Sequence, residues 1–285
     1  MSNENKEYLD ELIVEAENGN IEAQIKLATY YYAGIGGKQD YKKATYWFEK
    51  AAKQGDPSAK YNLAVCLWDG YGIKEDREKA ILLYNESAEQ GYPDAQYNLA
   101  VCLWNGYEIK KDKEKAIYWY RKSAEQGFPS AQFNLGQIYY VGDCVEQDVD
   151  QAIYWFKKSA EQGNANAQFG LGAIYGNGGV PAKQNYAEAF KWYLKSAEQG
   201  NSYAQCELAK CYYNGWGVKR DLKKAEQWIT KSAKQGNETA KELLAALKAS
   251  KKGVGYYLIR IIGFPFWLIW QFLKAVLSVI KAMFQ

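Results

Sequence analysis

Histidine is absent from this chain of 285 residues. A protein without histidine lacks the side chain that most often serves as a general base and most often binds a transition metal. Glycine pairs such as Gly70/Gly72 follow no predicted strand and precede no Gly-Lys-Ser/Thr run, which argues against a phosphate-binding loop. We therefore expect no catalytic residues, no metal and no cofactor, and a protein that binds partners without transforming them.

Cysteine is scarce and shows no pairing. Its count of five is odd, and three of the five, Cys66, Cys102 and Cys211, occupy the same position within three of the structural units. Such a recurring position indicates a small buried side chain. Cys206 and Cys211 are five residues apart, a spacing typical of neither a metal site nor a catalytic pair. The sequence therefore predicts free thiols, as is usual in the cytoplasm.

Negative charge disappears towards the C-terminal end. No acidic residue follows Glu242, whereas six lysines and arginines do, so residues 1–242 carry a net charge of −3 and the remainder carries +6. A mildly acidic body argues against nucleic acid as a partner, and a basic apolar tail favours an anionic membrane surface. The segment MSNENKEYLDE has neither the basic start nor the apolar core of a secretory signal, so we expect the body in the cytoplasm.

A period of 36 residues dominates the rest of the sequence. An Ala-x-x-Gly signal recurs at intervals of 36 residues, with one interval of 37 that reflects a one-residue insertion between Gly176 and Asn185. A fixed period of this length indicates an array of stacked repeats. The glycines of the signal are Gly19, Gly55, Gly91, Gly127, Gly163, Gly200 and Gly236.

Each period predicts two helices. In the first, a segment of the form Ala-(Gln/Lys)-x-x-Leu-(Ala/Gly), as at residues 95–100, places alanine and leucine on one helix face. The second carries an apolar stripe of alanine followed by large side chains, and most of the 25 tyrosines and 10 tryptophans fall on such core positions. Glycines that end the first helix are expected at Gly34, Gly70, Gly106, Gly142, Gly178 and Gly215. N-caps of the second are expected at Asp40, Asp76, Asp112, Asp148, Asn185 and Asp221.

The combined pattern, Asp-x-x-x-Ala-x-x-Trp-(Phe/Tyr)-x-x-(Ser/Ala)-Ala-x-x-Gly followed by Ala-Gln-x-x-Leu-(Gly/Ala), resembles the Sel1-like repeat family. It is clearest at residues 112–136 and 148–172, and it covers nearly all of residues 10–248. The resemblance implies an all-α, right-handed superhelical solenoid of about six 36-residue helix-turn-helix repeats, related to tetratricopeptide arrays, whose members typically act as adaptors. Two departures concern the second glycine of the turn, which is replaced by Glu108 and Cys144.

One helix pair cannot cover its own apolar face, so the ends of such an array need caps. We divide the chain accordingly. Residues 1–19 form an N-terminal capping helix and residues 20–236 the repeats, followed by a capping helix with a basic linker at 237–252 and a hydrophobic tail at 253–285.

Three asparagines, Asn62, Asn98 and Asn134, recur at one position of the first helix, where asparagine is a poor helix former. In tetratricopeptide arrays the first helices line the concave surface. The resemblance therefore implies that these amides hold the backbone of an extended peptide. The alternative is that they are solvated or form hydrogen bonds within the solenoid. The glutamines two residues earlier in the motif, such as Gln96, are interpreted as structural.

The tail does not follow the repeat. Residues 254–273 contain a single charge, Arg260, and reach the length of about 20 residues that a membrane-spanning helix needs. Polar side chains from Gln271 onwards recur every three or four residues, which equally suits a helix lying in the headgroup region or facing copies of itself. A third alternative folds the tail onto the solenoid or into a partner's groove. The predicted membrane-associating residues are Arg260, Trp267, Trp270, Lys274 and Lys281.

These features together predict a non-enzymatic adaptor. Its cytoplasmic solenoid would bind a protein or peptide client on the concave surface, and its C-terminal hydrophobic helix would hold it at a membrane. A rival hypothesis makes the tail a membrane-perturbing or oligomerising effector of the toxin or defence type, controlled by the solenoid. In that case copies of the chain would assemble through the tail.

Overall fold

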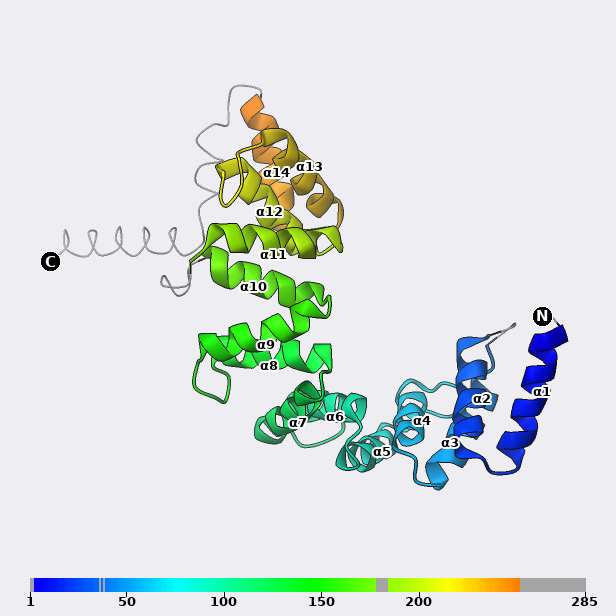
Figure 1. The fold of residues 1–285 in the computed structure, drawn as a ribbon. Coiled ribbons are helices and arrows are strands. Elements are labelled where there is room, and N and C mark those ends of the chain that lie inside the picture. Colours follow the sequence, from blue (N-terminus) through cyan, green and yellow to red (C-terminus); the bar gives the residue numbers. More distant parts are fainter. Residues whose placement is uncertain (1–2, 36, 38, 178–183, 252–285) are drawn as a thin grey trace. The chain divides into compact units, whose positions relative to one another are not determined.

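The computed structural model of the protein describes residues 3–35, 37, 39–177 and 184–251. These residues form fourteen α-helices and no strand, in agreement with the predicted all-α class (Figure 1). Six helix pairs lie between two single helices, α1 (Asn3–Glu17) and α14 (Glu238–Lys251). The first helices of the pairs are α2 (Ile21–Ala33), α4 (Pro57–Asp69), α6 (Pro93–Asn105), α8 (Pro129–Val141), α10 (Ala165–Asn177) and α12 (Ser202–Asn214). The second helices are α3 (Tyr41–Lys53), α5 (Arg77–Glu89), α7 (Lys113–Glu125), α9 (Val149–Glu161), α11 (Tyr186–Glu198) and α13 (Leu222–Lys234).

The chain divides into two compact units, residues 1–135 and 136–285, with the boundary inside α8. Within each unit every helix packs against the next one along the chain, from α1 to α7 and from α9 to α14 (Figure 1). Neighbouring helices therefore cover each other's apolar faces, as the repeat pattern predicts. The predicted hydrophobic helix at 253–285 lies outside the described residues.

Small and large side chains alternate in the packing between helices. The alanines of the second-helix stripe, such as Ala80 and Ala116, are fully buried and allow close approach of the neighbouring helix. The motif leucines of the first helices are buried between neighbouring helices, and Leu27, Leu171 and Leu208 are fully buried. Burial of such side chains is the main favourable contribution to folding of each repeat.

The predicted helix boundaries are confirmed wherever the structure describes them. Each N-cap side chain accepts a hydrogen bond from a backbone amide in the first turn of its second helix, which satisfies a group without a partner inside the helix. Each first helix then ends on a glycine in the left-handed region, with φ between 68° and 78° at Gly34, Gly70, Gly106, Gly142 and Gly215. Gly178 lies outside the described residues.

The residue two positions after the glycine that ends the first helix is glycine in some repeats and carries a side chain in others. At Gly72 φ is 71°, and a Cβ atom placed there would collide with the backbone carbonyl of Tyr41 on α3. The equivalent residues of the next two repeats, Glu108 and Cys144, keep a left-handed φ of 50° and 62° and yet carry side chains. The departures noted in the sequence thus preserve the conformation of the turn.

The residue at the start of the preceding second helix distinguishes the two forms. Tyr41 stacks on Tyr71, directly before Gly72, with 4.9 Å between ring centroids. The pair Tyr186 and Trp216 repeats this stack at 5.5 Å, directly before Gly217, where a Cβ atom would also meet backbone. At the corresponding places before Glu108 and Cys144 the helices start with Arg77 and Lys113. We infer that an aromatic stack holds the turn against the preceding helix and leaves room only for glycine.

Buried polar side chains link neighbouring helices. Gln96 is 3% exposed, donates through Nε2 to the Ala88 carbonyl on α5 at 3.1 Å, and accepts from Nε2 of Gln126, the C-cap of α7, at 2.8 Å. The same arrangement recurs at Gln205, which donates to Ala197 O at 3.1 Å and accepts from Gln235 at 2.8 Å. The interpretation of the motif glutamines as structural is therefore confirmed at both positions.

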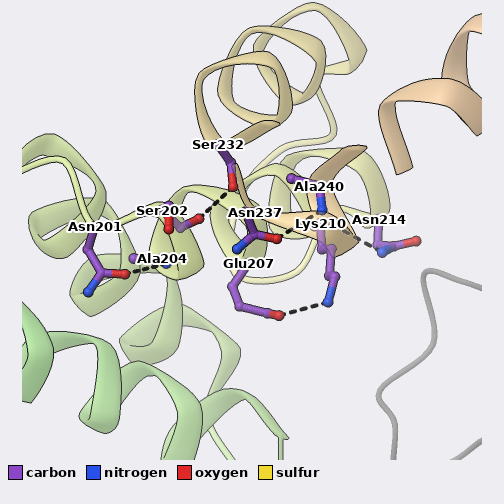
Figure 2. Close-up of polar contacts among 9 residues, drawn as sticks. All are labelled: Asn201, Ser202, Ala204, Glu207, Lys210, Asn214, Ser232, Asn237 and Ala240. Atoms are coloured by element: carbon purple, nitrogen blue, oxygen red, sulfur yellow. Dashed lines mark hydrogen bonds and ion pairs between the residues drawn. The ribbon is translucent and has the colours of Figure 1, made fainter. Parts of the chain in front are cut away.

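A serine of the second helix makes a further link, to the start of the first helix in the same pair. Figure 2 shows the last such pair, in which Ser232 Oγ donates to the Ser202 carbonyl at 2.6 Å. Two asparagine N-caps accept first-turn amides beside it, Asn201 at 2.9 Å and Asn237 at 3.0 Å. Local caps and bonds between helices thus fix each pair together.

One buried hydroxyl has no partner. Tyr193 on α11 is 2% exposed, and its hydroxyl makes no hydrogen bond with the described residues. Burial raises the pKa of this hydroxyl well above its usual value, so it stays neutral. Replacing Tyr193 with phenylalanine removes the unpaired group, and we expect stability to rise by about 1 kcal/mol, measured as a higher denaturant midpoint. Tyr120→Phe is the matched control, because it removes a hydrogen bond to Asn134 and is expected to lower the midpoint.

Candidate functional site

The three asparagines lie half-buried on α4, α6 and α8, and each has a partner within the first unit. Asn62 Nδ2 donates to the Ser58 carbonyl at 2.8 Å. The Asn98 side chain forms hydrogen bonds with the hydroxyl groups of Tyr61 and Tyr84. The structure therefore fits the alternative of hydrogen bonds within the solenoid, and binding of a peptide by these amides remains a prediction.

The partner of each asparagine depends on the preceding second helix. Asn98 faces Tyr84 of α5, and Asn134 forms the same hydrogen bond with Tyr120 of α7. One repeat earlier than Tyr84, the equivalent residue is Phe48, which has no hydroxyl, and Asn62 bonds to backbone instead. Two of the three asparagines thus lie beside a tyrosine hydroxyl of the preceding second helix.

An open cavity of about 400 Å³ lies beside Asn98, between α4, α5 and α6. Three aromatic rings surround it closely: Tyr84 lies 5.9 Å from Tyr61 and 6.3 Å from Trp68, measured between ring centroids. Tyr107, from the turn after α6, lies 6.3 Å from Trp68 and is 49% exposed. The cavity is lined by Tyr61, Val65, Trp68, Asp69, Tyr84, Asn98, Val101, Cys102 and Tyr107.

Burial raises the pKa of three groups in the cavity wall. Burial raises the pKa of Tyr61 to about 12, and it raises the pKa of Tyr84 further. Burial also raises the pKa of the Cys102 thiol to about 11. At neutral pH these hydroxyl and thiol groups therefore keep their protons and supply no activated nucleophile. The cavity offers aromatic faces, an amide and one exposed carboxylate, which are features of a binding site.

The next repeat carries a related set of side chains with different charge. Tyr120 lies 5.9 Å from Tyr97 and 6.3 Å from Trp104, the same centroid distances as in the first set. Asn105, however, takes the place of Asp69. The rings therefore recur in the next repeat, whereas only the first of the two sets has the carboxylate.

The last repeat presents another surface at the same positions. Glu207 and Lys210 of α12 stand where Asn98 and Val101 stand on α6, and they form an ion pair at 2.7 Å (Figure 2). The three repeats compared thus place different side chains on the same scaffold positions.

Sequence reasoning named the asparagines and missed the cavity. It assigned most of the aromatic residues to the core, whereas Trp68 is half-buried and Tyr107 is half-exposed. The 36-residue spacing of Tyr61 with Tyr97 and of Trp68 with Trp104 was the available signal.

The other predicted sites have different outcomes. Arg260, Trp267, Trp270, Lys274 and Lys281 lie outside the described residues, and among the helices that are described none has the length and apolar character to cross a membrane. The cysteines are free thiols, and Cys66, Cys102 and Cys211 are buried as predicted. Cys206 is also buried and Cys144 is exposed.

Comparison with protein families identifies six copies of one repeat. The family model described as "Sel1 repeat" matches residues 21–56, 57–92, 93–128, 129–164, 165–201 and 202–237. Each match contains one first helix and the second helix that follows it. No curated protein matches the chain at a significant level.

Solved structures resemble the chain over most of its length, and two of them share about a third of its sequence. One is c5321 of uropathogenic Escherichia coli, a protective antigen with an SLR fold, at 35% identity and a TM-score of 0.78. The match covers 90% of this chain but only 55% of the antigen, so this chain spans about half of that protein. The other is a Sel1 repeat protein from Oxalobacter formigenes, at 33% identity and a TM-score of 0.70, with 76% of this chain and 89% of that protein covered.

Proposed function

The chain belongs to the Sel1 repeat family, and from that premise we propose that it is a non-enzymatic scaffold that binds a protein or peptide partner at the cavity between α4, α5 and α6. Sel1 repeats generally mediate protein–protein interactions. The observation that carries the proposal is the aromatic cavity beside Asn98, whose volume of about 400 Å³ is enough for a large side chain. Partly exposed aromatic side chains of this kind are typical anchors of protein interfaces.

The same unit has a second exposed aromatic side chain, Tyr118, which is an alternative binding surface. Tyr118 of α7 is 53% exposed, and its ring packs edge-on against Trp119 at 5.0 Å. Lys122 lies over the same ring at 5.9 Å. We favour the cavity, because several rings line about 400 Å³ of open space there, whereas Tyr118 is an exposed ring on the helix surface.

Photo-crosslinking distinguishes the two surfaces. A photoreactive benzoylphenylalanine is placed at Tyr107 in one variant and at Tyr118 in another, and both are irradiated in extracts of the native source. We expect the Tyr107 variant to give a defined crosslinked protein, identified by mass spectrometry, and the Tyr118 variant to give none. Trp68→Ala in the Tyr107 background should abolish the product. A product from Tyr118 alone would contradict the proposed surface.

We further propose that the tail holds this scaffold at a membrane from the cytoplasmic side. The support is the sequence: residues 254–273 carry only Arg260 as a charge, and the tail as a whole is basic. Deleting residues 253–285 is expected to move the protein from the membrane fraction to the supernatant on ultracentrifugation. The control is Lys274→Ser with Lys281→Ser, which keeps the apolar residues and should weaken only salt-sensitive binding. An unchanged distribution after the deletion would contradict anchoring.

A further inference from the structure

Four aromatic rings surround the cavity and make a surface that attracts cations. Tyr61, Trp68, Tyr84 and Tyr107 each present a π-system, and successive centroids lie 5.9 to 6.3 Å apart. The face of an aromatic ring carries negative electrostatic potential, so several rings around one space favour a positive group. The chain shows this preference itself, because the Arg77 guanidinium lies over the Trp68 ring at 5.2 Å.

The charge of the cavity is negative. Asp69 is the single charged residue among those that line it, and no lysine or arginine does so. Arg77, the cation next to Trp68, is paired with Glu75 at 2.9 Å, which offsets its charge. Asp94 of α6 adds a second carboxylate near Tyr61 and contributes to the raised pKa of that hydroxyl.

The position of Asp69 at the end of a helix strengthens the negative electrostatic potential of the cavity. It is the last residue of α4, where the carbonyl groups of the final turn give a helix its partial negative charge. Gly70 caps the helix through its amide to the Cys66 carbonyl, and Tyr71 donates to the same carbonyl. An entering cation therefore meets a carboxylate, the C-terminus of a helix and several aromatic rings.

Other occupants are less well matched. An anionic side chain would meet the carboxylate of Asp69 as a like charge. A neutral apolar side chain would displace water from that carboxylate without supplying a partner, which costs free energy. A cation pays its own desolvation cost but recovers it from the rings and the carboxylate together.

We propose that the cavity between α4, α5 and α6 receives a lysine or arginine side chain of the partner, held among the aromatic rings that line it with its charge towards Asp69. This inference rests on the proposed function and adds to it the chemistry of the occupant. The partner segment is accordingly a basic peptide.

Titration of the intact protein with short peptides tests the proposal. The probes are acetyl-Ala-Arg-Ala-amide and the same peptide with citrulline, which has nearly the shape of arginine but no charge. We expect saturable shifts of the Trp68 indole resonance in NMR spectra, with binding about tenfold tighter for the arginine peptide. Equal binding of the two peptides, or no saturable binding by either, would overturn the proposal.

Two variants test whether the carboxylate of Asp69 is the group that recognises the positive charge of the peptide. Asp69→Asn gives the cavity the side chain that the next repeat carries at Asn105, and it should abolish the preference for arginine over citrulline. Combining it with Asn105→Asp restores the net charge of the protein, but with the carboxylate in the next repeat. The double variant should lose the preference as the single variant does, and a restored preference would show a general charge effect and overturn the proposal.

The two proposals fail in different ways. If Tyr107 crosslinks a partner and Trp68→Ala abolishes the product, while arginine and citrulline peptides bind equally, the surface is right and the cationic occupant is wrong. If Tyr107 yields no crosslink, the proposed binding function itself fails.

Discussion

Replacing Gly72 with alanine is expected to unfold the turn between α4 and α5 and to destabilise the first unit by about 3 kcal/mol or more. The added Cβ would collide with the Tyr41 carbonyl, and the backbone at φ 71° is already unfavourable for a side chain. Relief requires the turn to leave α3. That movement would break the stack of Tyr71 on Tyr41 and the hydrogen bond from Thr45 Oγ1 to the Tyr71 carbonyl at 2.7 Å.

Gly55→Ala is the matched control. Gly55 has φ 96°, also a conformation that alanine rarely adopts, but a Cβ there meets nothing within 4 Å. We expect the stability of this variant to fall only by the conformational cost, about 1 to 2 kcal/mol. Guanidinium-induced unfolding followed by circular dichroism measures both, and hydrogen exchange assigns the loss to helices. Equal effects of the two substitutions would show that the collision with α3 contributes nothing.

Replacing Gln96 with methionine is expected to cost about 2 kcal/mol, because methionine keeps the length of the side chain and removes its hydrogen bonds. Gln96 connects α6 to two neighbouring helices: it donates to Ala88 on α5 and accepts from Gln126, the C-cap of α7. Its loss leaves the Gln126 amide with one partner fewer, although the Gly91 carbonyl at 2.9 Å remains. The effect should be largest in the exchange rates of α5, α6 and α7.

Lys60→Met provides the comparison, since Lys60 occupies the position of Gln96 one repeat earlier. It forms no glutamine link and instead pairs with Glu86 at 2.8 Å, near the surface. A partly exposed ion pair of this kind contributes less than about 1 kcal/mol. If Lys60→Met destabilises the protein as much as Gln96→Met, the buried glutamine link is not what holds the repeats together.

The two substitutions also show why the binding surface sits on a stable frame. Gly72 and Gln96 fix α3 to α7 relative to one another within the first unit, and the cavity is formed by α4, α5 and α6. A site on helices fixed in this way keeps its rings in place before a partner arrives. Loss of either link is therefore expected to weaken binding at Trp68 even though neither residue lines the cavity.

The sequence by itself determined the helices, their ends and their order. Asp76 caps α5 and Gly70 ends α4 because each effect depends on backbone within a few residues, which a local pattern records. The role of Gln96 was also predictable, since its motif recurs with the 36-residue period. Stacking of one repeat on the next follows from the same period.

Only the tertiary structure decided which side chains meet. Gly72 is required because Tyr41, 31 residues earlier, stacks under its turn, whereas Glu108 is accepted where Arg77 takes that place. The partner of Asn98 is likewise set by Tyr84 on another helix. The cavity itself depends on contacts between three helices, and its open space is what those contacts leave unfilled. No spacing along the chain records that space, because it is a property of packing between elements.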